Sequence, residues 1–141
     1  GVALLQRTII VVGSKLIFGV NWGDLTGAIS VVLLFCLVGT GAAKLFASVL
    51  NNAQQAIGVA LLLGLGMAAI GGSMAPLEVF PETLRKIAHV TPHAWGNEAF
   101  IELIGGGGNV TDILPQLGVL AAYAAVLLVL ATWHLRRTLT R

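Results

Sequence analysis

The stretch "PLEVFPETLRKIAHVTPHAW", residues 76–95, lies between two long apolar runs and differs from both. It holds three of the chain's four prolines, two of its three histidines and four charged residues. The apolar runs on either side are long enough to be buried in lipid, so this polar stretch must be a connection between them. The same contrast between polar and apolar stretches divides the rest of the chain into membrane spans and connections.

The composition of the whole chain is that of an integral membrane protein. It is 57% hydrophobic and 10% charged, whereas soluble domains carry about 25% charged residues. A soluble fold with so few charges could not cover its apolar surface. The net charge is only +2, and the basic residues are scattered, so no nucleic-acid partner is expected. The single cysteine, Cys36, excludes an internal disulfide.

Four apolar segments approach the length of about 20 helical residues that a bilayer core of about 30 Å requires. The first is the weakest, because Arg7 and Lys15 interrupt it. The amide-rich "NNAQQ", residues 51–55, separates the second from the third. We predict an all-α integral membrane fold in which residues 1–141 form a single transmembrane domain. Its four transmembrane helices are predicted at about 2–20, 25–46, 56–74 and 114–133.

Charge placement predicts the orientation of these helices. Basic residues accumulate on the cytoplasmic side of membranes, which places Arg136, Arg137 and Arg141 at a cytoplasmic C-terminus. With four alternating spans, every acidic residue then falls on the outer side. These residues are Asp24, Glu78, Glu82, Glu98, Glu102 and Asp112.

The polar stretch and its continuation predict two short helices over about residues 80–104. Pro81 suits a first helical position, while Thr91 suits an N-cap with Pro92 opening the second helix. In that second helix Trp95 begins an apolar stripe, and "GGGG", residues 105–108, stops it. Both helices are too short and too polar to span. They are expected to lie at the outer interface, with Trp95 as an anchor, or to enter the membrane and return.

No catalytic, cofactor-binding or metal-binding residue is predicted, and the chain is not expected to be an enzyme. His89 and His93 have the spacing of two metal ligands on a helix, but Pro92 separates them and no third ligand is near. "GLGMAA", residues 64–69, lies within an apolar span and lacks the βαβ context of a dinucleotide site. Glycines spaced by four, such as Gly19 and Gly23, leave open either packing within one bundle or a dimer interface.

The order of residues from Gly71 onward is similar to that of a known family. "GGSMAPLEVFPETLRKIAHVTPHAW", residues 71–95, is followed by "AFIELI", a glycine-rich turn, one last span and a basic tail. This arrangement resembles permeases of the ABC-2 type, the membrane subunits of ATP-binding-cassette exporters. The residues that fit the family pattern are Gly71, Gly72, Pro76, Leu77, Pro81, Leu84, Ile87, Ala88, Pro92 and Trp95.

The resemblance implies six spans per permease, so the four spans here would be the third to the sixth of a C-terminal fragment. The location would be a bacterial or archaeal cytoplasmic membrane. Two permease copies, identical or different, would pair with ATP-binding-cassette ATPase subunits that bind and hydrolyse ATP. Substrate, whether drug, lipid or glycan, would pass between the permeases. The helix pair would shape the outer exit, and its gate residues would be Gly71, Gly72, Pro76, Pro81, Pro92 and Trp95.

A second class of function remains open from the sequence. A non-transporting scaffold or assembly subunit could use the same glycine-rich faces to bind other membrane helices. Such a protein would have no associated ATPase, whereas the permease would.

Overall fold

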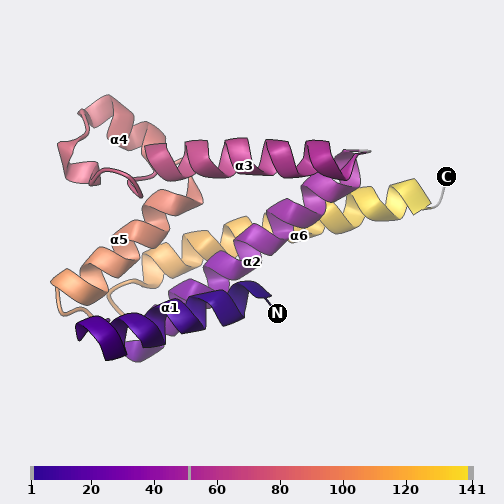
Figure 1. Cartoon of the computed structure of the whole chain (residues 1–141). Coiled ribbons are helices and arrows are strands. Elements are labelled where there is room, and N and C mark those ends of the chain that lie inside the picture. The colour runs from indigo at the N-terminus through magenta and orange to yellow at the C-terminus, as the bar shows by residue number, and fades with distance from the viewer. Residues whose placement is uncertain (1, 51, 140–141) are drawn as a thin grey trace.

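The computed structural model describes residues 2–50 and 52–139. These residues form helices and connecting turns, with no strand among them, and the predicted all-α class is confirmed. The elements in chain order are α1 (Val2–Phe18), α2 (Leu25–Val49), α3 (Ala53–Ile70), the 3-10 turn η1 (Leu77–Val79), α4 (Glu82–Ala88), α5 (Pro92–Gly105) and α6 (Leu114–Leu139), as Figure 1 shows.

Three of the described helices, α2, α3 and α6, are long and apolar enough to cross a membrane. The first predicted span is shorter: α1 has 17 residues, or about 25 Å at the usual rise of 1.5 Å per residue. The arrangement with four spans therefore stays a prediction. The side chain of Arg7 and the whole of Arg141 lie outside the described part of the chain.

The third span is predicted at about 56–74, whereas the helix in this region, α3, covers Ala53–Ile70. Asn52 begins the helix early: its side chain accepts a hydrogen bond from the Gln54 N–H at 2.9 Å. Gly71 caps the C-terminus, and Gly72 follows with φ at +87°, a conformation that favours glycine. The apolar residues after Gly72 thus belong to a turn, although their hydropathy matches that of the span.

Two other helices extend beyond the spans predicted for them. α2 continues beyond residue 46 to Val49, and α6 continues beyond residue 133 to Leu139. In α6 the helix runs on beyond the apolar residues through His134 and two arginines, whereas in α2 it runs on through Ala47, Ser48 and Val49. In α6 the last turns carry Arg136 and Arg137, which suit a helix C-terminus.

The long helices α2 and α6 run in the same direction and pack along each other (Figure 1). Gly41 is buried at their contact, where an added Cβ would lie 2.8 Å from Leu127 Cβ. Glycine therefore allows the two backbones to approach closely. The main core joins this pair to α5. Its buried side chains are Ala28, Val31, Ala99, Leu103, Ile113 and Leu120.

Helix α3 stands apart from this pair. It contacts α2 near their short connection and contacts α5 and α4 near its C-terminus, and none of its 18 residues is buried. Figure 1 shows α5 crossing between the C-terminal end of α3 and the N-terminal ends of α2 and α6. α5 is thus the element that ties α3 to the rest of the bundle at this end.

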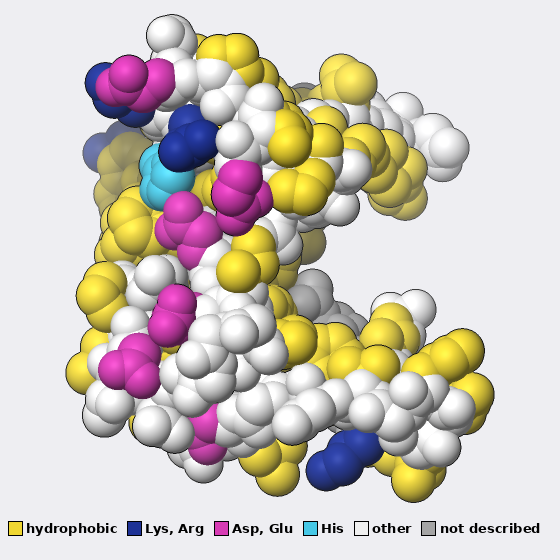
Figure 2. Space-filling view, turned by 90° about the vertical axis from the view of Figure 1, so that its left-hand side faces the viewer, with side chains coloured by type: hydrophobic (Ala, Val, Ile, Leu, Met, Phe, Trp, Pro, Cys, Tyr) yellow, Lys and Arg dark blue, Asp and Glu magenta, His cyan; other side chains and the backbone are white. Residues whose placement is uncertain are grey.

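Acidic side chains gather on the face of the molecule that carries α4 and α5 (Figure 2). All six acidic residues precede α2, lie in η1, α4 or α5, or precede α6. Arg136 and Arg137 lie at the opposite end, in the last turns of α6. The acidic residues thus lie at one end of the fold, with Arg85 and Lys86 of α4 among them, and the direction of this arrangement across the membrane stays a prediction.

Candidate functional site

The segment between α3 and α6 folds back on itself, with η1 and α4 on one side and α5 on the other. Its turn, residues 89–91, lies beside the body of α6: the Tyr123 hydroxyl donates to the Val90 carbonyl oxygen at 2.6 Å. Tyr123 is the tenth residue of α6, which puts this contact about 13 Å along α6 from its start. The turn between α4 and α5 is therefore set back from the end of the bundle.

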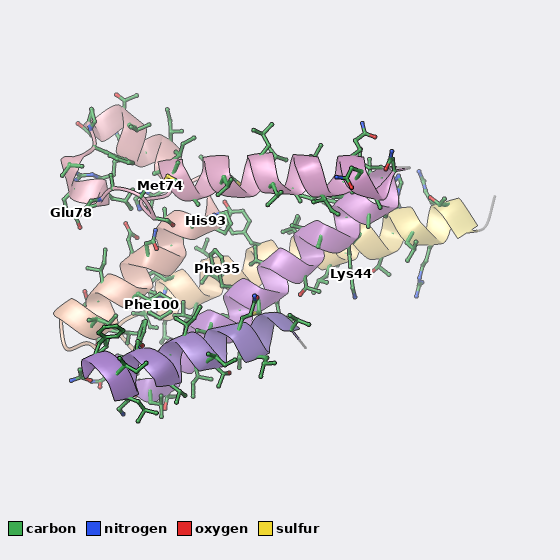
Figure 3. All side chains as sticks on the ribbon, viewed as in Figure 1. Phe35, Lys44, Met74, Glu78, His93 and Phe100 are labelled. Carbon is green, nitrogen blue, oxygen red and sulfur yellow. The ribbon has the colours of Figure 1, made fainter. Side chains whose placement is uncertain are left out.

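Contacts along α5 also show that its N-terminus lies further from the end of the bundle than its C-terminus. Near its N-terminus, the His93 ring meets the Phe35 ring of α2 edge to face, with centroids 5.0 Å apart. Near its C-terminus, the Leu103 backbone lies against Gly23, just before α2 begins, so closely that a Cβ at Gly23 would overlap the Leu103 carbonyl. α5 thus runs from beside Phe35 to the N-terminal end of α2 (Figure 3).

Gly71 is the point at which α3 meets α5. An added Cβ there would lie 2.5 Å from His93 Cβ and 2.6 Å from Thr91 Oγ1, so only glycine fits without movement of α5. The Gly71 carbonyl accepts a hydrogen bond from Asn97 Nδ2 at 2.8 Å, and the same nitrogen donates to Ser73 Oγ at 3.0 Å. The predicted gate residue Gly71 is therefore buried against the N-terminal turns of α5.

Gly72 and Pro76 shape the turn that leads to η1. Gly72 has the left-handed φ noted above, and a Cβ on it would lie 2.7 Å from Leu77 Cγ. Leu77 is buried with Ala88 and Ala94 in a second, smaller core. Pro76 is the N-cap of η1. Both predicted residues thus position Leu77, which packs α4 against α5.

The two remaining prolines open the short helices, but in different ways. Pro81 is the N-cap of α4, with ψ at 151°, rather than its first helical residue as predicted; its carbonyl accepts from the Arg85 N–H at 3.0 Å. Pro92 does begin α5, and the Thr91 side chain caps it by accepting from the Ala94 N–H at 3.4 Å. That second prediction is confirmed.

Trp95 lies in the predicted stripe but contacts the end of α4. Its Nε1 donates to the His89 carbonyl oxygen at 2.8 Å, and its ring meets the His89 ring edge to face at 5.2 Å. The indole therefore satisfies one of the C-terminal carbonyls of α4 that have no partner within the helix. Its role as an interfacial anchor stays a prediction.

The carbonyl groups of Ala88, His89 and Val90, at the end of α4 and in the α4–α5 turn, each receive a side-chain hydrogen bond. The Thr91 hydroxyl donates to Ala88 O at 2.8 Å, next to the Trp95 bond to His89 O and the Tyr123 bond to Val90 O. Three successive carbonyls thus have a hydroxyl or an indole as donor. Such satisfaction is what a backbone requires where water is scarce.

His89 joins α4 to α5, a role that the sequence did not indicate. Its Nε2 lies 2.7 Å from Glu98 Oε1, and its Nδ1 lies 2.8 Å from the Arg85 carbonyl oxygen. The contact with the Arg85 carbonyl raises the pKa of His89 most, the Glu98 carboxylate raises it further, and partial burial opposes both. His93 faces Phe35 instead. Among residues 2–50 and 52–139, no three potential metal ligands come together.

The segment after α3 and one face of α5 border an open recess of about 570 Å³. Figure 3 shows two of its lining side chains, Met74 and Phe100, on either side. Ile101 and Ile104 of α5 complete its apolar wall, and Asn97 lies at its edge. Figure 2 shows the molecule hollowed between its upper and lower parts. The recess is therefore mainly apolar and bordered by the residues around Gly71.

Comparison with known proteins agrees with the geometry of a membrane protein built from long helices. Residues 1–133 match the family model described as ABC-2 family transporter protein. The linearmycin resistance permease protein LnrN of Bacillus subtilis (strain 168) is 30% identical over 122 residues, which cover 86% of this chain and 32% of that protein. The chain thus spans about a third of the length of this relative. No solved structure matches the chain significantly. The resemblance noted in the sequence is confirmed, and the chain belongs to the ABC-2 family of transporter proteins.

Proposed function

We propose that this chain is part of the permease subunit of an exporter and that the segment from Gly71 to Gly105 is its outer gate. Family membership and a relative named as a permease support a transporter permease subunit. The gate, the direction of transport and the partners are our proposal. The gate residues are those predicted from the sequence: Gly71, Gly72, Pro76, Pro81, Pro92 and Trp95.

One observation supports the proposal that this segment is a gate. α5 contacts α2, α3 and α6 at once, and its N-terminal end is held to α3 through Asn97 and Gly71. A movement of α3 relative to α2 and α6 must therefore displace α5 or break these contacts. Rigid short helices fixed to moving spans are a common device for turning a rocking motion into opening or closure.

The energy for that motion would come from other subunits. We propose a separate ATP-binding-cassette ATPase that binds the permease on the cytoplasmic side, where Arg136 and Arg137 would lie, and a second permease copy that completes the pathway. The ATPase would bias the spans between two arrangements. Because LnrN is named for linearmycin resistance, efflux of linearmycin is the first cargo to test.

A reversible cross-link tests the gate directly. In the full permease with Cys36 replaced by serine, Ser73→Cys and Asn97→Cys would be introduced together, since their side chains meet at 3.0 Å. A cysteine is shorter than the asparagine that makes this contact, so a short thiol-cleavable bis-thiosulfonate reagent would join the two sulfurs and fix α5 to the end of α3. We expect ATP-driven transport in proteoliposomes to stop on cross-linking and to return on reduction. The two single-cysteine variants are the controls.

Full transport by the completely cross-linked permease would contradict the gate. A scaffold function predicts a different result. In that case the full protein would bind no ATPase in native membranes and would transport nothing before cross-linking.

A further inference from the structure

We propose that His89 and Glu98 form a pH-sensitive latch that holds α4 to α5, closed by a shared proton and loosened when that proton leaves. The latch itself is a property of the two helices. Its effect on transport rests on the proposed gate, of which α4 and α5 are part.

The geometry of the two ring nitrogens carries this inference. Nδ1 faces the Arg85 carbonyl oxygen at 2.8 Å, and Nε2 faces Glu98 Oε1 at 2.7 Å. A carbonyl oxygen only accepts, and so does an ionised carboxylate, while a neutral imidazole has one N–H to donate. Both contacts are hydrogen bonds only if His89 is an imidazolium or Glu98 is protonated. Either way the pair holds one proton more than neutral His89 beside ionised Glu98.

Loss of that proton breaks one of the two bonds. If Nδ1 keeps its hydrogen, the lone pair of Nε2 faces the carboxylate of Glu98. If Nε2 keeps it, the bond to Glu98 survives without the charge on His89, and the lone pair of Nδ1 faces the Arg85 carbonyl within α4. In both cases the charge-assisted contact between α4 and α5 is lost or weakened, because a hydrogen bond between ionised partners is stronger than one with a neutral donor. The proton can leave to water, because the His89 side chain is 29% exposed and that of Glu98 31%.

The charged groups of α4 itself act on His89 in a defined way. The Arg85 guanidinium opposes protonation of His89, but it is directed towards η1 and donates to the Leu77 and Glu78 carbonyl oxygens. Glu82 and Lys86 pair with each other at 2.7 Å on the exposed face of α4. Neither of that pair forms a described contact with His89.

The neighbouring helices add one carboxylate and no other charge at the contact. α5 contributes Glu98 and the ring of Trp95. α3 has no charged residue, and α6 reaches this turn through the phenol of Tyr123. Glu98 is therefore the one charged group at this contact that raises the pKa of His89, in addition to the larger effect of the Arg85 carbonyl.

The sign of the pH dependence follows from the raised pKa of His89. The latch is fully closed below the ordinary value of 6.5 and opens as the pH rises through the higher value in the folded protein. In the proposed orientation the latch lies on the outer side. The external pH, rather than the internal pH, would then control it.

Hydrogen–deuterium exchange of the full permease in detergent micelles, followed by mass spectrometry between pH 5.5 and 8.5, tests the latch. Exchange at the imidazole C2 position reports the pKa of His89, and amide exchange over residues 82–98 reports separation of the helices. After correction for the intrinsic pH dependence, we expect amide exchange about fivefold faster at pH 8.5 than at pH 6, the factor that one partly exposed ion pair supplies.

Two variants and a matched control complete the test. Glu98→Gln keeps the shape but not the charge, so the pKa of His89 should fall and the amide exchange should lose its pH dependence. His89→Gln should abolish the pH dependence as well. Glu102→Gln changes a carboxylate one turn further along α5, which forms no described contact with His89, and should behave as the wild type.

Amide exchange that is independent of pH in the wild type would overturn the latch, and so would an unchanged pKa of His89 in Glu98→Gln. These results are independent of the gate. If the cross-linked permease stops transporting while exchange shows no pH dependence, the gate stands without the latch. If exchange depends on pH but the cross-linked permease transports normally, the latch stands without the gate.

Discussion

Replacement of Gly71 by alanine tests how closely α3 and α5 must approach. The new Cβ would lie 2.5 Å from His93 Cβ and 2.6 Å from Thr91 Oγ1, where ordinary van der Waals contact begins near 3.4 Å. Neither neighbour is the tip of a flexible side chain, and Thr91 is buried. The N-terminal turn of α5 must therefore move by about 1 Å, which costs about 2 kcal/mol by the measured range for overpacked cores.

The same movement weakens a hydrogen bond. Asn97 Nδ2 lies 2.8 Å from the Gly71 carbonyl oxygen, and loss of such a bond costs about 1 kcal/mol. Together the two effects are large compared with the marginal stability of folded proteins. We expect Gly71→Ala to lower the free energy of unfolding of the full permease in detergent and to slow ATP-driven transport.

Gly64→Ala is the matched control on the same helix. Apart from the adjacent residues and backbone of its own helix, no described atom lies within 4 Å of the position of its added Cβ. Alanine is favoured over glycine in a helix interior by about 1 kcal/mol. The two variants should therefore shift the stability in opposite directions. Equal stability of Gly71→Ala and Gly64→Ala, or wild-type transport by Gly71→Ala, would refute the reasoning.

Three further substitutions test the packing of the bundle. Gly41→Ala should lower the stability by about 2 kcal/mol, because the new Cβ would lie 2.8 Å from Leu127 Cβ of α6. Gly39→Ala, on the open side of α2, should leave the stability almost unchanged. Thermal unfolding of the two variants measures the difference. Tyr123→Phe removes the bond to the Val90 carbonyl and should cost about 1 kcal/mol, seen as faster amide exchange in the α4–α5 turn. Asp24→Ala removes the N-cap of α2 and should cost about 1 kcal/mol in chemical unfolding, while Asp24→Asn should retain most of that stability.

Local chemistry made parts of the site predictable from the sequence. Thr91 and Pro92 specify a helix start with a side-chain acceptor and a fixed φ, and the structure has both. The glycines after α5 specify a stop, and Gly107 adopts a φ of +65°. Each of these signals depends on residues adjacent in the chain. These local signals therefore predict the same helix ends whatever the tertiary fold.

Contacts between distant segments could not be predicted in the same way. Hydropathy extended the third span to residue 74, because it does not register that Gly72 takes a left-handed conformation. The indole of Trp95 was expected at the interface, and the structure directs its N–H to the end of α4. The pairing of His89 with Glu98 joins residues nine apart on two helices, and no periodicity indicates it. These features need the relative placement of α4 and α5.

The arrangement of the α4–α5 turn gives a physical reason for the concentration of polar residues in residues 76–95. If α6 spans a membrane as proposed, a turn that is set back along α6 lies where bulk water is limited, and each unsatisfied carbonyl there would be costly. Thr91, Trp95 and Tyr123 each supply a donor to one of three successive carbonyls. Two of these donors lie within the polar stretch, and the third comes from the neighbouring span. Part of the polarity of the stretch therefore serves its own backbone as the chain returns towards the start of α6, and loss of any of the three donors should loosen α5 before it unfolds the bundle.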